Sequence, residues 1–274
     1  MSTLQRLIKY CAMAFAIFLI VSIIGGIVGG LGAVYGLFNR GSGSVAGGDM
    51  RTIAISGPVE NLDLEISAAA LQIVTGEDFS VQTNHKYLTM EETRGTLVIS
   101  EEKLPLGSSF EGVSVILTVP EGFVFQDASL ETGAGKVDIE TLSAGTLELD
   151  LGAGATEIGS VSAATRAKIE TGAGKLTIRD AALNDLDMDM GVGKLEFTGR
   201  LTGTCDVDFG IGDAVMTLLG SREDYCIRMD KGIGQATLDG ETMGDGSTYG
   251  GGRNRLDMSG GIGSIRIRFQ ADRT

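Results

Sequence analysis

The sequence predicts an all-β protein: a single-domain parallel β-helix, or β-solenoid, of about eleven short coils behind one N-terminal transmembrane helix. A Gly-x-Gly triplet recurs in the second half of the chain at steps of 19, 20, 19, 19, 22 and 29 residues, and a fixed spacing of this kind indicates a solenoid. Apolar and polar residues alternate on both sides of each triplet, as in strands with one buried face. Residues 11–37 form an uncharged, mostly apolar run that is long enough to span a bilayer.

The composition excludes several classes of protein. The chain has 274 residues with 42 glycines, 3 cysteines and a net charge of −14. The glycines keep no three-residue period, which excludes collagen, and 3 cysteines cannot hold together a disulfide scaffold of this length. All 36 acidic residues follow position 40, so nucleic acid is not an expected partner.

The N-terminal part predicts membrane attachment. We expect residues 1–10 to be a cytoplasmic N-terminus, because Arg6 and Lys9 precede the apolar run and basic residues favour the cytoplasmic side. Residues 11–37 are then a signal-anchor helix with the lipid bilayer as partner. A cleaved signal peptide is the alternative, although its apolar region would be shorter. The expected location is the cell membrane, crossed once, with the C-terminal domain extracytoplasmic.

The apolar run is also rich in glycine, and its small-xxx-small spacings would let two helices approach closely. They suggest a homodimer through the membrane helices, but glycine is common in such helices in any case. The glycines concerned are Gly25, Gly26, Gly29, Gly30, Gly32 and Gly36. Residues 38–50 have the Gly/Ser composition of a flexible tether, and residues 51–274 remain for the extracytoplasmic solenoid.

Each repeat reads as a strand, a glycine turn, a second strand and a short return. The glycine pairs are Gly133 and Gly135, Gly152 and Gly154, Gly172 and Gly174, Gly191 and Gly193, Gly210 and Gly212, Gly232 and Gly234, and Gly261 and Gly263. The residue between the glycines is apolar in every copy, so we expect it to point inward and the corners to stack on one another. Residues 51–127 read as earlier, less regular coils, because short alternating runs lie between turn residues.

At this level the chain resembles the bacterial putative-adhesin family of unknown function, which is similar in pattern to auto-transporter adhesin head domains. The residues that carry the resemblance are LDLEISAAALQIVTGEDFSVQTN, GTLVISEE, VILTVPEGFVFQDASLETGAGKVDIETL and the Gly-x-Gly coils, within about residues 51–269. The resemblance implies a parallel β-solenoid, often behind a membrane helix. It implies no catalytic motif, and the 29-residue step and the Cys205/Cys226 pair depart from the pattern.

Few residues suggest catalysis or a cofactor. His85 is the only histidine, which excludes a histidine-based triad and a zinc site with several histidines. Thr-Gly-Ala-Gly-Lys at 132–136 and 171–175 lacks the earlier glycine and the Ser/Thr of a phosphate-binding loop. Cys205 and Cys226 are about one coil apart but alternate to opposite faces, so both a bridge and a buried thiol beside a free one remain open. No cofactor or catalytic residue is expected.

An acidic ladder is the candidate binding feature. It occupies the position two residues before each first glycine: Glu131, Asp150, Glu170, Asp189, Asp208 and Asp230, with Ser259 ending the series. Stacking would place successive carboxylates ~5 Å apart on the outer surface, with Lys136, Lys175 and Lys194 expected to relieve part of the repulsion. The ladder is either a solvated face that keeps the protein soluble, or a surface for weak binding of divalent cations or a cationic envelope polymer.

The glycine-rich segment 240–255 is the second candidate. It carries Asp245, Tyr249 and Arg253 and suggests a flexible interaction loop. The sequence thus favours a non-enzymatic, adhesin-like binding protein with a cell-envelope polymer or protein as partner. An envelope scaffold, or an accessory of an envelope-stress signalling system, is the alternative. A polysaccharide-degrading β-helix enzyme is a third interpretation, but the short coils leave almost no residues for the loops of a cleft.

Overall fold

The computed structural model describes residues 46–55, 57–102 and 110–271. These residues belong to one compact unit, made of residues 45–104 and 110–274. In its described part, no helix has the length and apolar character needed to cross a membrane. The predicted cytoplasmic segment, the signal anchor of residues 11–37 with its glycines, and the tether up to residue 45 lie outside the described residues. Residues 46–50 of the predicted tether belong to the first strand.

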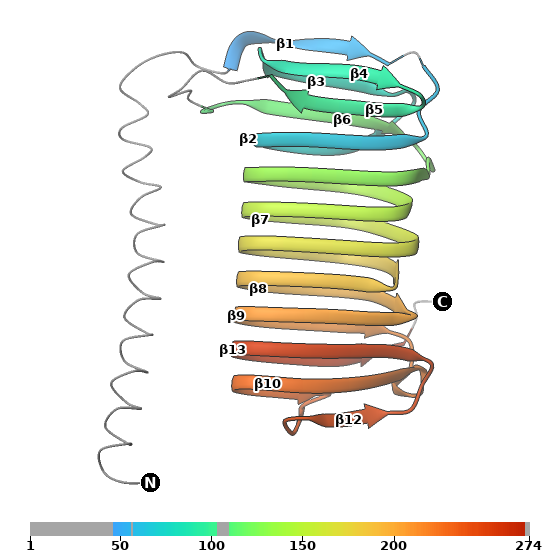
Figure 1. Cartoon of the computed structure of the whole chain (residues 1–274), viewed down its shortest axis with the longest axis vertical. Coiled ribbons are helices and arrows are strands. Elements are labelled where there is room, and N and C mark those ends of the chain that lie inside the picture. Colours follow the sequence, from blue (N-terminus) through green and yellow to red (C-terminus); the bar gives the residue numbers. More distant parts are fainter. Residues whose placement is uncertain (1–45, 56, 103–109, 272–274) are drawn as a thin grey trace, which may run out of the picture. The chain divides into compact units, whose positions relative to one another are not determined.

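The described chain is almost entirely extended and forms a 13-stranded sheet. In chain order the elements are β1 (Ala46–Ala54), β2 (Asn61–Gly76), β3 (Ser80–His85), β4 (Leu88–Thr93), β5 (Thr96–Glu101), β6 (Ser114–Pro120), β7 (Phe125–Asn184), β8 (Leu186–Thr202), β9 (Thr204–Leu219), the short 3-10 helix η1 (Arg222–Asp224), β10 (Tyr225–Leu238), β11 (Glu241–Thr242), β12 (Ser247–Gly250) and β13 (Asn254–Gln270). Within β7 the chain passes through three Gly-x-Gly triplets, so this one element winds through several coils (Figure 1).

The regular coils stack in parallel, as the sequence predicts. Strand β2 pairs in parallel with the first coil of β7, β7 with β8, and β8 with β9. Equivalent residues of successive repeats are partners, for example Met188 and Val207. The alternating residues therefore superpose from coil to coil and bury one continuous aliphatic core, whose members include Leu130, Leu149 and Ile169.

The coils do not stack in sequence order at the C-terminal end. Strand β13, the last of the chain, lies between β9 and β10 and pairs in parallel with both. Leu256 lies between Cys205 and Ile227 in this register. The 29-residue step in the repeat has a physical cause, since residues 239–253 carry the chain from the outermost coil back to the gap that β13 fills (Figure 1).

The N-terminal end shows the same inversion. Strands β5 and β6 form an outer coil, because they pair in parallel with the first and second halves of β2. Strand β2 therefore lies between this outer coil and β7, although it precedes β5 and β6 in the chain. The prediction that residues 51–127 form successive coils is correct only for β2, β5 and β6. Strands β1, β3 and β4 are antiparallel to their partners, so about eleven coils was too high for the described residues.

Parts of the segment of residues 240–255, whose glycines suggested a flexible loop, form the short strands β11 and β12. Strands β11 and β12 pair antiparallel with the two ends of β10, and Tyr249 is the partner of Ile227. Met243 is buried and Tyr249 packs against the core. The segment covers part of the outer edge of β10, which would otherwise expose unpaired backbone groups.

Candidate functional site

The glycine corners are fixed by contact between stacked backbones. A Cβ added at Gly191 would lie 2.4 Å from the carbonyl oxygen of Gly172, and one at Gly193 would lie 1.8 Å from that of Gly174. In all seven copies the second glycine also has positive φ, between 141° and 150°. Both glycines are therefore required by close approach, and the second also by its backbone conformation.

The first corner of the stack contains no glycine. Ser67, Ala68 and Ala69 of β2 take the place of a triplet, and the added Cβ of Gly133 would meet the carbonyl oxygen of Ser67. Ala69 does not have a positive φ. No Gly-x-Gly corner lies on its outer side, because β5 and β6 are joined there by residues 102–113, only part of which the structure describes. A corner can therefore carry side chains when no Gly-x-Gly corner is stacked on its outer side.

The residues between the glycines point outward, so the prediction that they face the core is wrong. Ile233 is 66% exposed and Ile262 is 41% exposed. The two flanking glycines place the middle residue at the outer apex of the turn, while the core is filled by residues further along each strand. In spatial order this corner ridge consists of Ala68, Ala134, Ala153, Ala173, Val192, Ile211, Ile262 and Ile233.

The acidic ladder is present, with one change of order. Glu170 lies beside Asp189 on the neighbouring strand, and Asp189 lies beside Asp208 in the next coil. Because β13 is inserted, Ser259 does not end the ladder but lies between Asp208 and Asp230. Its hydroxyl donates a hydrogen bond to Asp208, which relieves the crowding at this point.

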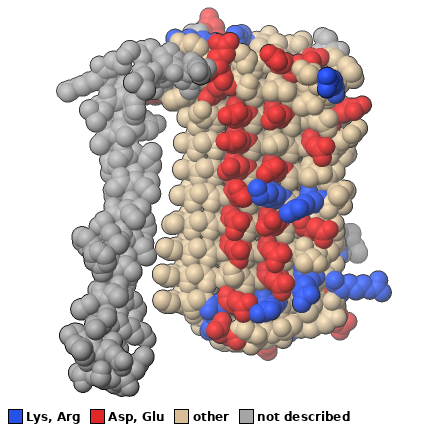
Figure 2. Space-filling view, viewed as in Figure 1, with Lys and Arg blue, Asp and Glu red and all other residues tan. Residues whose placement is uncertain are grey.

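Sequence reasoning missed two further parts of this face. Glu65 pairs with Glu131 and extends the ladder onto β2. A second acidic column lies two residues further from the corner. In this column Asp187 lies beside Asp206 on the neighbouring strand, and Asp206 lies beside Asp257. Figure 2 shows both columns running along the stack. The period of two in the strands could have revealed the second column, since residues i and i−2 share a face.

Partial burial and mutual repulsion shift pKa values on this acidic face. Partial burial and the neighbouring carboxylates Asp208, Asp187 and Glu170 raise the pKa of Asp189. Partial burial, followed by Asp257 and Asp187, raises the pKa of Asp206. Lys168 interrupts the second column and its Nζ lies 3.1 Å from Glu148 and 3.0 Å from Glu170. These carboxylates therefore lie in a field that favours the binding of cations.

The lysines expected to relieve the ladder lie on the opposite side of the corner. Lys136 pairs with Asp138, with 2.9 Å between Nζ and Oδ2. Lys175 and Lys194 both pair with Glu196 and lower its pKa to about 2. The residue three after the first glycine belongs to the second strand of the coil. Alternation places it on the same face as the residue two positions later, which brings Lys136 near Asp138 and Lys194 near Glu196. One face of the solenoid is thus predominantly acidic, although Arg166, Arg228 and Arg255 form ion pairs with carboxylates there. On the other face, Glu157 and Glu196 pair with basic side chains.

The single histidine has a structural role in the described chain. His85 is fully buried and its Nε2 lies 2.9 Å from Oε1 of Glu101. Its Nδ1 accepts a hydrogen bond from the backbone N–H of Tyr87, so Nε2 carries the proton that is donated to Glu101. Burial raises the pKa of Glu101, but hydrogen bonds from His85 and Ser67 outweigh this and lower the pKa overall.

The two distal cysteines are free, Cys205 buried and Cys226 partly exposed. This confirms the buried thiol beside a free one, since the inserted β13 separates their coils and alternation turns them to opposite faces. Burial raises the pKa of Cys205 to about 11, which makes its thiol unreactive at neutral pH.

Of the three residues of the candidate loop, Asp245 and Arg253 are exposed and Tyr249 is half-buried, and two of them support the turn. Asp245 accepts a hydrogen bond from the backbone N–H of Lys231, and the hydroxyl of Tyr249 accepts one from Gly244. Asp245 and Tyr249 thus stabilise the turn, and the role of the segment as an interaction loop stays a prediction.

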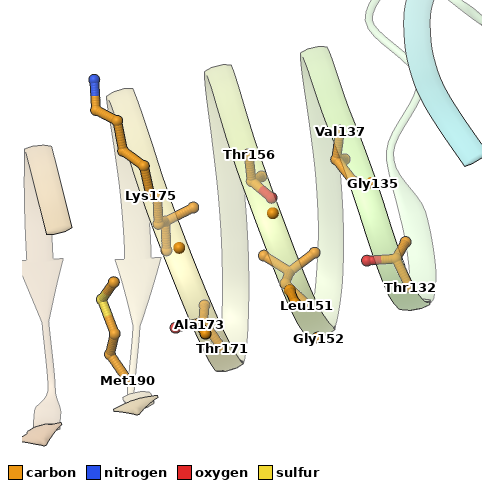
Figure 3. Close-up of a pocket in the computed structure, with 14 residues that line it drawn as sticks. Thr132, Gly135, Val137, Leu151, Gly152, Thr156, Thr171, Ala173, Lys175 and Met190 are labelled. Atoms are coloured by element: carbon orange, nitrogen blue, oxygen red, sulfur yellow. The ribbon is translucent and has the colours of Figure 1, made fainter. Parts of the chain in front are cut away.

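The hollows beneath the corners are small. The larger one lies between turns of β7 and β8, lined by residues such as Leu151, Thr171 and Met190 (Figure 3). It leaves about 20 Å³ for the centres of water molecules, where one water needs ~10–15 Å³. Among the described residues, no group of three or more His, Cys, Asp or Glu is arranged to hold a metal ion.

Comparison with family models settles the classification. The model of the Toastrack DUF4097 family matches residues 52–243. The chain belongs to the Toastrack family. The match covers the outer β10 coil but ends before β13, so the strand inserted into this Toastrack stack lies beyond the matched region. No curated protein matches the chain.

The chain is similar to several solved structures of low sequence identity. A putative cell adhesion protein from Clostridium sporogenes is 16% identical, with a TM-score of 0.36 over 81% of this chain and 99% of its own. A putative adhesin from Bacteroides fragilis is 14% identical, with a TM-score of 0.41 over 82% and 100%. A putative lipid binding protein from Parabacteroides distasonis is 14% identical, with a TM-score of 0.33 over 80% and 97%.

Proposed function

We propose that this Toastrack protein is a membrane-anchored, extracytoplasmic binding protein, and that its acidic face binds a cationic polymer or protein segment of the cell envelope without enzymatic action. The observation that carries the proposal is the contrast between the two faces. Asp189, Asp206 and Asp208 are exposed and lie in adjacent columns, whereas Glu157 and Glu196 on the other face are paired with basic side chains.

The geometry favours many weak contacts. Successive carboxylates of the ladder repeat with the ~4.8 Å spacing of paired strands, and an extended partner with regularly spaced positive charges could contact several of them at once. Each exposed ion pair contributes little, but linked contacts raise the overall affinity strongly. The same carboxylates would take up calcium weakly, through several sites of similar affinity.

A titration with polylysine tests the proposal. In the wild-type domain of residues 46–274 we expect binding that weakens steeply as salt is raised. The variant Asp150→Asn/Glu170→Gln/Asp189→Asn should bind at least tenfold more weakly. The matched control, Asp138→Asn/Glu157→Gln/Glu196→Gln, removes the same charge from the other face and should bind like the wild type. Equal affinities of the two variants would contradict a role for the ladder.

Calorimetry and melting curves with millimolar calcium extend the same comparison to hard cations. The wild type and the control variant should show weak heats and a small rise in Tm, and the ladder variant should show neither. Equal responses of all three proteins would leave the ladder with a role in solubility alone. A screen for degradation of envelope polysaccharides checks the enzymatic interpretation, because turnover would contradict a purely binding role.

The location is tested by surface proteolysis of intact cells. We expect protease to remove the domain of residues 51–274 while a cytoplasmic control protein survives. Protection of this domain together with the control would contradict the extracytoplasmic location, and with it the proposed partners.

A further inference from the structure

The corner ridge has a gradient in side-chain size that follows space and not sequence. Its first members, through Ala173, are alanines, and Val192 is next to Ala173. Ile211 follows, then Ile262 from the inserted strand β13, and then Ile233 from the outermost coil β10. The insertion of β13 thus brings three isoleucines side by side, of which Ile262 and Ile233 are exposed and Ile211 is half-buried.

This row is unusual on a soluble surface. Ile233 and Ile262 are two of only four large apolar side chains classed as exposed in the described part of the chain; the others are Met50 and Val124. Nothing in the packing of the coil requires an isoleucine at the apex, because alanine occupies the same apex in Ala134 and Ala173. Contiguous exposed apolar residues indicate an interaction site.

The charges beside the ridge identify the partner. On one side runs the acidic ladder, and on the other, at the same height in each coil, runs the column that contains Lys136, Lys175 and Lys194. This edge carries no net positive charge at its isoleucine end, where Asp208 and Asp213 flank the ridge, so an anionic bilayer is a poor occupant. The three lysines pair within their own chain, but 45–59% of each side chain remains exposed. Where the lysines lie, an acidic border and a lysine border are therefore complementary to a second copy of the same surface.

We propose that two copies of this chain associate ridge to ridge, in parallel, about a two-fold axis along the solenoid. That operation places the ladder of one copy opposite the lysine column of the other, so Glu131 faces Lys136, Glu170 faces Lys175 and Asp189 faces Lys194 of the second copy. An antiparallel dimer would instead place ladder against ladder, where like charges repel. The parallel arrangement sets Asp208 against Asp213, and each of these already accepts a hydrogen bond from a serine of its own chain.

The size of the contact predicts a weak dimer. Eight stacked corners at the strand spacing of ~4.8 Å give a ridge about 34 Å long. Because the ridge is also narrow, the area that it can bury lies at the low end of the range for specific interfaces. Confinement of both copies to one membrane would raise their effective concentration. This part of the inference rests on the proposed membrane anchor, so the test uses the full-length protein in membranes.

Disulfide crosslinking distinguishes the arrangements. In a background with Cys11→Ser and Cys226→Ser, single cysteines are placed on the ridge as Ala134→Cys, Ala173→Cys or Ile233→Cys. A parallel two-fold axis brings each residue near its own copy, so all three variants should form covalent dimers under mild oxidation. Val124→Cys is the matched control, since Val124 is 60% exposed but lies off the ridge, and it should remain monomeric.

Two further results complete the test. Adding Ile211→Ser and Ile262→Ser to Ala173→Cys should reduce crosslinking at least fivefold while the melting temperature of the domain stays unchanged, because neither side chain is in the core. Crosslinking of Ala173→Cys alone, near the centre of the ridge, would indicate an antiparallel dimer and overturn the proposal. Absence of crosslinking on the ridge, or equal crosslinking at Val124→Cys, would overturn it as well. None of these outcomes depends on polylysine binding, so the proposed function stands or falls separately.

Discussion

The seven Gly-x-Gly corners and the corner at Ser67–Ala69 occupy the same column of the solenoid but have different sequences. Each glycine of a triplet faces the carbonyl oxygen of the coil stacked beneath it, at a distance that leaves no room for a Cβ. At the first corner the hydroxyl of Ser67 instead helps to lower the pKa of the buried Glu101. The comparison teaches that glycine is required by the neighbouring coil and not by the turn alone.

The largest effect is expected inside the column. Gly193→Ala should destabilise the domain by about 3–5 kcal/mol, because the new Cβ meets the backbone of Gly174 and φ of 150° is unfavourable for alanine. Gly172→Ala should cost less, about 1–3 kcal/mol, since only the contact with Gly152 opposes it. Denaturant unfolding of the domain measures both. Equal losses would show that positive φ contributes nothing.

The next effect concerns the buried pair beside the first corner. His85→Ala should cost on the order of 3 kcal/mol, because it removes the main hydrogen-bond donor to the buried carboxylate of Glu101. The lowered pKa of Glu101 means that this stabilisation is present above the ordinary glutamate pKa and is lost as the pH falls through the lowered value. The difference between wild type and His85→Ala, followed by unfolding from pH 7 to pH 3, should therefore shrink on acidification. A constant difference would exclude the hydrogen bond from His85 to the Glu101 carboxylate as its source.

The smallest expected change is a gain in the free energy of unfolding, from a substitution on the acidic face. The raised pKa of Asp189 means that its charge opposes folding above that pKa and that protonation at lower pH relieves the repulsion. Asp189→Asn should therefore stabilise the domain at pH 7, by a few tenths of a kcal/mol because the group is mostly exposed. The gain should shrink in 1 M salt, which screens the neighbouring carboxylates but not the partial burial of Asp189. Thermal melts in low and high salt check this, and a loss of stability at pH 7 would contradict the repulsion.

The sequence predicted the repeating part of the fold well, for reasons visible in Gly191 and Gly193. Their spacing, the alternation around them and the apolar residues of each strand are local signals, and these determined the strands, the parallel stacking and the ladder. The direction of the corner residue was wrong, since an apolar residue such as Ile233 was assumed to be buried. Burial at a turn depends on which side of the backbone faces the core, and the alternation of the flanking strands does not continue through two glycines.

The order of the coils could not be predicted from these signals. Strands β9, β13 and β10 share one register and one pattern, so the sequence fits either order of stacking equally well. The only local indication was the length of the connection between β10 and β13. At the other end, β5 and β6 lack the glycine pattern, and their pairing with β2 depends on contacts distant in the chain. The inversions have a common result, because they place β2 and β13 between two neighbours and protect them from fraying.

Exchange of corner sequences tests the central claim most directly. One variant carries the first-corner residues inside the column, as Gly191→Ser/Gly193→Ala, and the other carries glycines at the first corner, as Ser67→Gly/Ala69→Gly. If stacking determines the need for glycine, the first variant should lose its cooperative thermal transition near the wild-type Tm, while the second keeps a transition that is lowered by only a few degrees. A first variant as stable as the wild type, or a second that is equally damaged, would contradict the account.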